Sequence, residues 1–226
     1  MKFHVGVPMG GLTYDPFAIS AIARKADEVG LHYVGGAERL IMPRVIESKY
    51  PRGNGDIPGV GTGQNMLEAQ SVMSFMAGQT KQIRFMPFFV VPYRNPILAA
   101  KMLATIDVLS NGRLSILVGP GWNREEANAM MVPTPWKLRG AVTNEYLNAF
   151  TELWSKQNPE FNGEFIKISD VDFAPKPVQQ PHIPYWIGGE SPAALRRAAL
   201  LGDGWAPAPN NQNYLLDTTE KFTNAV

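Results

Sequence analysis

Three short stretches of the chain combine residue types that could bind a ligand or take part in catalysis, and each directly follows an apolar run. They are the charged pair Glu38 and Arg39, the turn from Gly119 to Gly121, and the polar turn 188–191. In α/β proteins, ligands lie at the carboxyl ends of the strands, because the loops that leave those ends sit over the sheet or barrel. We therefore take all three stretches as candidate site residues.

The turn 188–191 has the sequence Gly-Gly-Glu-Ser and precedes Pro192. Ser191 is typical of a helix N-cap, and proline is favoured at the first helical position. The backbone N–H groups of Gly189, Glu190 and Ser191 would then point along a helix N-terminus, which is a ready site for a phosphate. This interpretation requires the Glu190 side chain to turn away.

The other two stretches each allow a simpler interpretation. Gly119 and Gly121 let the backbone approach a ligand closely, but they could equally serve a tight turn that needs glycine's conformational freedom. The dinucleotide-binding fingerprint is excluded, because it requires a third glycine where Arg124 stands. Glu38 and Arg39 could form a site or only an ion pair between the rim of the sheet and a neighbouring helix.

Composition narrows the class of protein. The chain has 226 residues, of which 45% are hydrophobic and 18% charged, which predicts a single domain over residues 1–226. The net charge of +1 gives no support to nucleic-acid binding, so we expect small-molecule partners. Cysteine is absent, and His4, His32 and His182 are too scattered to suggest a metal site. No apolar run reaches the roughly 18 residues of a membrane span, and a cytoplasmic location is expected.

Apolar runs alternate with helical patterns along the chain. Strands are predicted at about 3–8, 32–36, 83–91, 114–118, 185–187 and from 203 onward, and helices at 16–29, 67–78, 96–109, 138–154, 192–201 and in the tail to Val226. An Asn-Gly pair predicts a hairpin at 161–165. This order implies a parallel sheet or a (β/α) barrel, although the strand count falls short of eight.

Two segments break this regular pattern. Residues 43–65 are rich in proline and glycine, which predicts a long mobile loop that could serve as an active-site lid. Pro87 lies inside the third predicted strand, where proline forfeits a ladder hydrogen bond. It marks a bulge or an irregular peptide, a kind of strain that clusters at functional sites.

The sequence resembles the luciferase-like monooxygenase superfamily, and within it the short subfamily thought to use coenzyme F420, a deazaflavin. The resemblance covers nearly the whole chain and rests on motifs at 94–96, 100–101, 104–107, 109–113, 118–126, 175–178, 186–189 and 203–205. It implies an α/β fold, the (β/α)8 TIM barrel of the luciferase-like type, from which this chain lacks the last one or two βα units. Such barrels lay an isoalloxazine-like ring across the carboxyl ends of the strands.

The resemblance also implies an oxidoreductase that moves a hydride or activates oxygen on a small organic substrate, using coenzyme F420 or alternatively FMN. In such proteins the third strand often ends in a non-prolyl cis peptide behind the ring, and Pro87-Phe88 is the matching position. The expected cofactor-binding residues are Met9, Pro87, Phe88, Val90, Gly119, Gly121, Glu125, Gly188, Gly189, Glu190 and Ser191.

The sequence departs from the family pattern at the end of the second strand. Many deazaflavin-dependent members carry a histidine where this chain has Arg39, and arginine cannot shuttle protons near neutral pH. We therefore expect Arg39 to orient an anionic substrate or to stabilise developing negative charge, with Glu38 as the catalytic acid or base. The missing histidine leaves a non-catalytic flavin-binding barrel as an alternative.

The second departure is length, because family barrels usually continue for two more strand-helix units. Uncovered strand edges invite another chain, so a fragment or a short form that assembles as a homodimer or larger homo-oligomer is expected.

Overall fold

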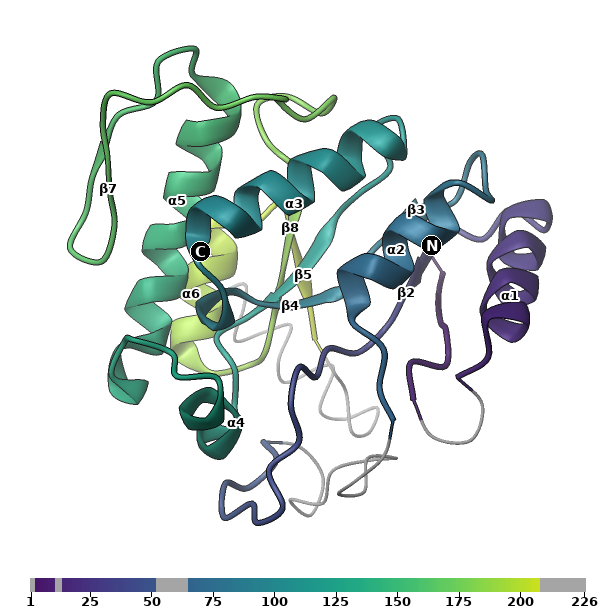
Figure 1. The fold of residues 1–226 in the computed structure, drawn as a ribbon, viewed down its shortest axis with the longest axis horizontal. Coiled ribbons are helices and arrows are strands. Elements are labelled where there is room, and N and C mark those ends of the chain that lie inside the picture. The colour runs from purple at the N-terminus through teal and green to yellow at the C-terminus, as the bar shows by residue number, and fades with distance from the viewer. Residues whose placement is uncertain (1–2, 11–13, 52–64, 208–226) are drawn as a thin grey trace.

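The computed structural model describes residues 3–10, 14–51 and 65–207, in which parallel strands form an arc wrapped by helices (Figure 1). The strands are β1 (His4–Gly6), β2 (Tyr33–Gly35), β3 (Arg84–Phe85), β4 (Phe88–Val90), β5 (Ile116–Gly119), β6 (Phe161–Asn162), β7 (Lys167–Ile168), β8 (Tyr185–Gly188) and β9 (Gly204–Ala206). The α-helices are α1 (Pro16–Glu28), α2 (Ala69–Ala77), α3 (Pro96–Leu109), α4 (Arg124–Ala129), α5 (Arg139–Ser155) and α6 (Pro192–Leu201). Short 3₁₀ turns, η2 (Val91–Tyr93) and η3 (Trp136–Leu138), complete the described elements.

The strands pair in the order β1-β2-β3 and β4-β5-β8-β9, and every pair in these two sheets is parallel. A bridge between Phe85 and Leu114 joins the two sheets, as does the hydrogen bond from the Leu117 N–H to the Pro87 carbonyl (2.9 Å). The described strands therefore make one continuous arc of a (β/α) barrel, as the alternation of elements predicted.

The third predicted strand is wrong in detail, because it is two strands separated by Pro87. The cis peptide expected at Pro87-Phe88 is also wrong, since the cis bonds of the described residues precede Pro175 and Pro181. The Phe88 N–H donates to the Gly36 carbonyl at 3.0 Å, so ladder bonds continue on both sides of the proline. On the other side, the Phe85 N–H already donates to the Arg113 carbonyl at 2.8 Å and the Pro87 carbonyl accepts from the Leu117 N–H at 2.9 Å, so Pro87 forfeits only the donor of its own position.

Three helix N-termini agree with the sequence. Asp15, Asn95 and Ser191 each cap a helix through the side chain, and a proline follows each of them. Helix α2 begins two residues later than predicted, because the Glu68 carboxylate accepts from the backbone N–H groups of residues 70 and 71. Glycine at position 30 follows α1 with φ of 73°, which suits a helix end.

The predicted hairpin is present as β6 and β7, which pair antiparallel around a four-residue turn, 163–166. The Glu145 carboxylate on α5 accepts from the backbone N–H groups of three turn residues, at 2.7 to 2.9 Å. Residues 52–64 of the predicted mobile loop and the predicted tail helix after residue 207 lie outside the described residues. No described helix is long and apolar enough to cross a membrane, and no group of metal-ligating side chains in the same residues could hold an ion.

Asp27 fastens the end of α1 to the start of β3. Its carboxylate accepts from the backbone N–H groups of residues 81, 82 and 83, at 2.8, 2.8 and 2.6 Å. Desolvation alone would raise the pKa of Asp27, but these bonds and the charge of Arg113 lower it overall. Because the pKa of Asp27 is lower in the folded than in the unfolded state, its carboxylate stabilises the fold at pH values above the unfolded pKa of roughly 3.9. This stabilisation is lost as the pH falls through the folded pKa.

We therefore expect Asp27→Asn to lower the free energy of unfolding by about 1–2 kcal/mol near neutral pH and by much less at about pH 2. Urea unfolding at the two pH values measures the difference. Glu28→Gln is the control, because Glu28 makes only an exposed pair with Lys25. An Asp27→Asn effect that did not shrink in acid would contradict this account.

Candidate active site at the carboxyl ends of the strands

The strands present two different faces. Phe85, Phe89, Val118 and Ile187 belong to the buried hydrophobic core under the helices. Because successive strand residues point to opposite faces of a sheet, the residues between them face the inner side of the arc. The inner face therefore carries Phe88, Leu117 and Trp186, followed along the strands by Val90, Gly119 and Gly188.

The inner face carries a layer of bulky side chains. Phe88 pairs with Leu117 and Leu117 with Trp186, so the three lie side by side. The Tyr33 and Trp186 rings meet edge to face across the arc, with centroids 6.0 Å apart. These side chains fill the arc below its carboxyl-terminal end.

Two residues further along each strand, the inner face changes to small side chains. Val90 pairs with Gly119, and Gly188 pairs with Ala206, while Gly35 ends β2. A Cβ placed on Gly119 would find no atom within 4 Å. A low floor therefore lies over the bulky layer, where a planar ring could rest. The alternation of side chains along the strands carries this signal in the sequence.

The turn after β5 needs glycine for its shape. Gly121 has φ of 84°, and a Cβ there would lie 3.0 Å from Val90 and 3.4 Å from the Tyr93 ring. Asn123 then caps α4 by accepting from the Glu126 N–H at 2.9 Å. The predicted tight turn is present, and its glycines also let the chain pass close to the inner face.

The turn after β8 has the shape that the phosphate interpretation requires. Gly189 has φ of 101°, which disfavours any other residue. The Trp205 indole N–H donates to the Gly189 carbonyl at 2.9 Å and braces the turn from β9. Ser191 caps the ten-residue helix α6, whose first N–H groups lack intrahelical partners. These features fit a phosphate group.

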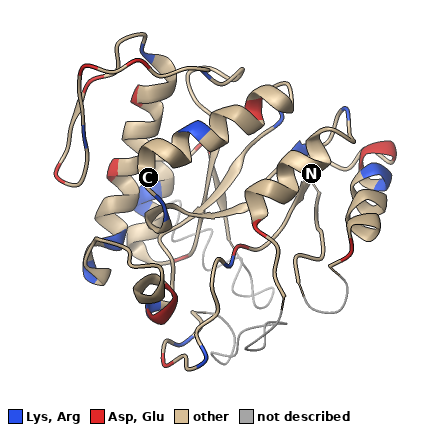
Figure 2. Cartoon of the chain, viewed as in Figure 1, with Lys and Arg blue, Asp and Glu red and all other residues tan. Residues whose placement is uncertain are grey.

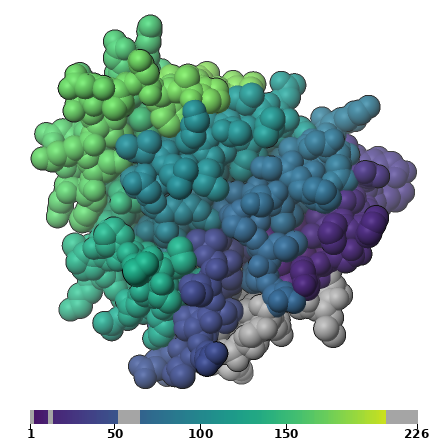
Figure 3. All heavy atoms as spheres, in the orientation of Figure 1, coloured from purple at the N-terminus to yellow at the C-terminus, as the bar shows by residue number. Residues whose placement is uncertain are grey.

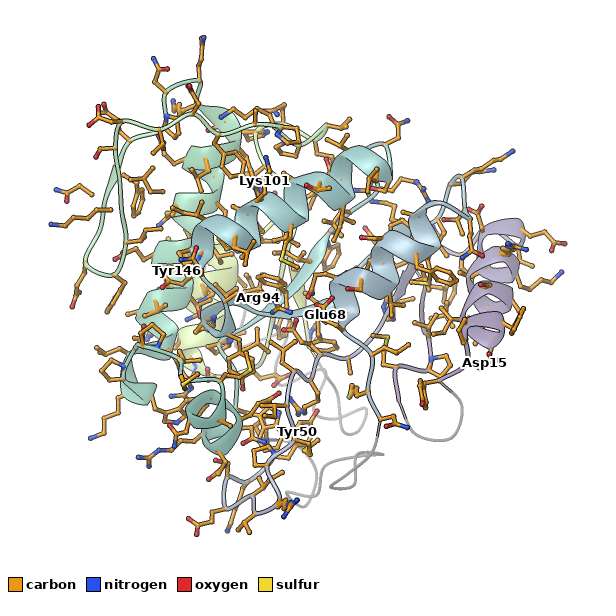
Figure 4. All side chains as sticks on the ribbon, viewed as in Figure 1. Asp15, Tyr50, Glu68, Arg94, Lys101 and Tyr146 are labelled. Carbon is orange, nitrogen blue, oxygen red and sulfur yellow. The ribbon has the colours of Figure 1, made fainter. Side chains whose placement is uncertain are left out.

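Glu38 lies at the end of β2 and is buried, with 4% of its surface exposed. Its carboxylate accepts from the Val90 N–H at 2.5 Å and pairs with the Arg94 guanidinium at 2.7 Å. Arg94 also pairs with Glu68 at 3.0 Å, and Figure 4 shows these two side chains next to each other at the centre of the molecule. Burial raises the pKa of Glu38, although Arg94 opposes the shift.

Arg39 forms a second buried ion pair, with Glu126 of α4 at 3.2 Å. The Glu126 side chain is fully buried and also accepts from the Leu40 N–H (3.1 Å) and the Tyr93 hydroxyl (3.2 Å). Burial, followed by the charge of Glu126, raises the pKa of Tyr93, so this hydroxyl stays protonated. Arg39 thus forms the ion pair with a neighbouring helix that the sequence allowed, but this pair lies inside the protein and not on an exposed rim.

An aromatic wall stands beside Arg39. The guanidinium lies over the Trp122 ring, 4.8 Å from its centroid, and the Tyr50 ring meets Trp122 edge to face at 5.1 Å. The Arg124 N–H donates to the Ser48 hydroxyl at 3.1 Å. The segment that ends at residue 51 therefore packs against α4, and Figure 3 shows the two as neighbouring blue and teal-green surfaces. The described part of the predicted loop therefore has defined contacts.

The remaining predicted site residues fall in different surroundings. Met9 is buried and fills the space beside Gly36. Glu125 faces residues 47 and 48: desolvation would raise its pKa, but hydrogen bonds from that segment lower it. The structure thus gathers Val90, Gly119 and Gly188 on one floor and places Glu38 and Arg39 beside it, while Glu125 contacts the outer segment. Sequence reasoning missed Arg94, Glu126 and Trp122 as partners of the pair.

A family model and several known proteins match this chain. A family model described as luciferase-like monooxygenase matches residues 2–224. The uncharacterized protein Rv0953c of Mycobacterium tuberculosis (strain ATCC 25618 / H37Rv) is 32% identical over 195 residues, which cover 85% of this chain and 68% of that protein. The FMNH(2)-dependent dimethylsulfone monooxygenase of Pseudomonas putida is 31% identical over 142 residues, or 62% of this chain and 39% of that protein.

Solved structures share the fold. An F420-dependent secondary alcohol dehydrogenase in complex with an F420-acetone adduct superposes with a TM-score of 0.78 at 20% identity, and the match covers 100% of this chain and 64% of that one. The described strands therefore form part of a TIM barrel of the luciferase-like type, and the match spans less than two thirds of that solved structure. The family model, the sequence relatives and the fold together show that the chain belongs to the luciferase-like monooxygenase family.

Proposed function

We propose that this protein is a flavin- or deazaflavin-dependent oxidoreductase acting on a small organic substrate. The observation that carries the proposal is the floor of Val90, Gly119 and Gly188 at the carboxyl ends of the strands. A helix N-terminus borders this floor on one side, and buried charged side chains border it on the other. This combination suits a planar ring with one phosphate.

The relatives support this class of cofactor. One is named as dependent on FMNH2 and another on F420, which supports a cofactor of this type for this chain. When bound, such a cofactor supplies hydride transfer or oxygen activation, while the protein supplies position and electrostatics. Coenzyme F420 is our first proposal, and FMN in a monooxygenase is the alternative.

We assign roles to residues from their places in the structure. Phe88, Val90, Gly119 and Gly121 would hold the ring, together with Met9 and Pro87. Gly188, Gly189, Glu190 and Ser191 would hold the phosphate through backbone N–H groups. Glu125 stays a proposed cofactor residue, although its contacts lie with residues 47 and 48.

Glu38 and Arg39 are the proposed catalytic residues. Burial raises the pKa of Glu38, although Arg94 opposes the shift, and we propose this carboxyl group as the acid or base. Arg39 is the residue that we propose stabilises negative charge developing on an oxygen, because its guanidinium lies at the end of β2 beside Trp122. Glu38 and Arg39 are each held in an ion pair, as purely structural residues often are. This favours the second candidate, a barrel that binds the cofactor without catalysis.

Turnover assays distinguish the two candidates. Hydride transfer from small alcohols to coenzyme F420, and oxidation of FMNH2 by oxygen coupled to small substrates, can be followed by visible absorbance. An oxidoreductase must turn over at least one substrate with one cofactor. Tight cofactor binding without turnover across a broad panel would favour the non-catalytic barrel.

The phosphate turn gives a separate prediction. Gly189→Asp should weaken FMN binding by about ten-fold or more, about 1.4 kcal/mol, relative to Gly189→Asn. Both variants strain the same backbone and have nearly the same shape, so the difference reports the added carboxylate. Flavin fluorescence measures the affinities, and equal affinities in two folded variants would remove this turn from the phosphate site.

A further inference from the structure

We propose that two copies of this chain associate through the outer face of α2 and α3, so that the four helices form a bundle. The outer face consists of two rows of residues that point away from the strands, namely Ser71, Phe75 and Gly78 on and directly after α2, and Leu98, Met102, Thr105 and Leu109 on α3. The interface is independent of the proposed cofactor. It places the self-association expected from the sequence on a helical surface, and not at uncovered strand edges.

The two helices are apolar on their outer side as well as on their inner side. They lie side by side in front of the strands (Figure 1), and inner residues such as Met73 and Leu103 are fully buried in the core. On the outer side, Phe75 is 46% exposed, Leu98 55% and Leu109 63%. Single exposed apolar residues are common on protein surfaces, whereas a group of large ones on two adjacent helices marks an interaction site.

The spacing of the two rows is that of a contact between helices. The members of each row follow one another at alternating steps of four and three residues, from 98 to 109 on α3 and from 71 to 78 on α2. Such steps keep a row of side chains on one side of a helix, and they are the steps by which helices pack along each other in bundles and coiled coils. A partner that is itself helical therefore fits this face.

The outer face carries no charged residue in either row. Helix α2 contains none at all, and α3 contains only Lys101 and Asp107. The Lys101 amine donates to the Ala174 carbonyl, and Asp107 is fully buried and accepts from Gln179 at 3.0 and 2.7 Å. Figure 2 shows α2 and α3 mostly tan, whereas α1 carries red and blue. A helix that faces water normally presents charged residues on its outer side, so this pair of helices is suited to being covered.

A second copy of the chain is the occupant that this face fits, because the face is complementary to itself. In a two-fold contact the same residues meet from both sides, so charged rows would repel each other, and these rows are uncharged. The large side chains of Phe75, Leu98 and Leu109 can pack over the small residues at 71, 78 and 105 of the other copy, as knobs into holes. The other described helices, α1, α4, α5 and α6, all contain charged residues. Among the described helices, α2 and α3 of a second copy are therefore the match.

The size of the face also suits a dimer. Five large apolar residues of α2 and α3 are 41 to 63% exposed, namely Phe75, Ile97, Leu98, Val108 and Leu109. Together they expose on the order of 500 Å², which is as much as the largest apolar patch of a typical monomer. The small and polar residues between them extend the face toward the roughly 800 Å² that each partner buries in a stable complex.

The test measures the mass of the purified 226-residue protein in solution by sedimentation velocity and by size-exclusion chromatography with light scattering. We expect a dimer with a Kd below about 10 μM. The purified protein offers no partner other than its own copies, so the occupant is identified at the same time. A wild-type protein that stays monomeric up to about 100 μM would overturn the inference.

Leu98→Glu is the decisive variant. Residue 98 lies in the first turn of α3, where an acidic side chain is favoured by the helix dipole, so the monomer should remain folded. In the dimer, the change places an unpaired carboxylate in the apolar contact of both copies, and we expect the Kd to rise by about 100-fold or more. If this variant does not fold, Phe75→Ser replaces it and should weaken the dimer by about ten-fold or more, because it removes an aromatic residue from the contact. A folded variant of either kind that dimerises as the wild type does would contradict the inference.

Leu200→Glu is the matched control, because Leu200 of α6 is 80% exposed and lies outside the outer face of α2 and α3. This variant should dimerise with the wild-type Kd. Hydroxyl-radical footprinting adds a second measurement: oxidation of Met102 should fall as the protein concentration rises, whereas Met131, which is 85% exposed, should react equally throughout. A dimer that Leu200→Glu dissociates as strongly as Leu98→Glu, or that protects Met131 and not Met102, would place the contact on another surface and overturn the inference.

Discussion

Leucine in place of Gly119 is expected to leave the protein folded and to weaken cofactor binding by about 100-fold or more, about 2.7 kcal/mol. A Cβ on Gly119 meets no atom within 4 Å, so the backbone at this position has room for a side chain to begin. The leucine side chain would occupy the floor beside Val90, where the ring is proposed to lie. Equilibrium titration with visible absorbance measures the loss, and circular dichroism and thermal melting establish the fold.

Gly78→Leu is the matched control. Gly78 ends α2, has helical φ and ψ, and a Cβ there would approach only the Phe75 carbonyl, at 4.0 Å. This variant adds the same volume far from the strand ends and should bind cofactor as the wild type does. If Gly119→Leu bound cofactor with wild-type affinity, the floor would not be the ring site.

Arg39→Ala is expected to lower the free energy of unfolding by about 3–5 kcal/mol, because it leaves the fully buried Glu126 carboxylate without its countercharge. Urea denaturation at neutral pH measures the change. Lys25→Ala is the comparison, since Lys25 pairs with Glu28 at 3.0 Å while both side chains are more than half exposed. We expect that control to cost less than about 1 kcal/mol.

Similar losses in the two variants would mean that the Arg39–Glu126 pair is solvated in the native protein. A loss in Arg39→Ala that largely disappeared in the double variant Arg39→Ala/Glu126→Gln would confirm that the unpaired carboxylate causes it.

The order of elements could be predicted from the sequence because local signals agree with the fold. Asp15, Asn95 and Ser191 each precede a proline and a helical pattern, and all three cap helices in the structure. The sequence marks Pro87 as a break within one strand, whereas the structure has the two strands β3 and β4 there. Whether a proline bends a strand or separates two strands depends on which neighbours pair on each side, and that is a long-range property.

The site was only partly predictable for the same reason. Glycine turns and a charged pair at strand ends are visible locally, so Gly119, Gly189, Glu38 and Arg39 could be selected. The partners that decide their chemistry lie far away in the chain: Glu126 is 87 residues from Arg39, and Arg94 is 56 residues from Glu38. Charge balance and burial appear only when these segments meet, so the sequence alone could not show that both side chains are held in buried ion pairs.

The most direct test of the central claim is an equilibrium titration of the purified 226-residue protein with FMN and with coenzyme F420, followed by visible absorbance and competition. The account predicts saturable binding of at least one cofactor, with a stoichiometry near one per chain, that is displaced by the other or abolished by Gly119→Leu. A folded protein that binds neither cofactor at concentrations approaching about 1 mM, where binding would amount to only about 4 kcal/mol, would contradict it.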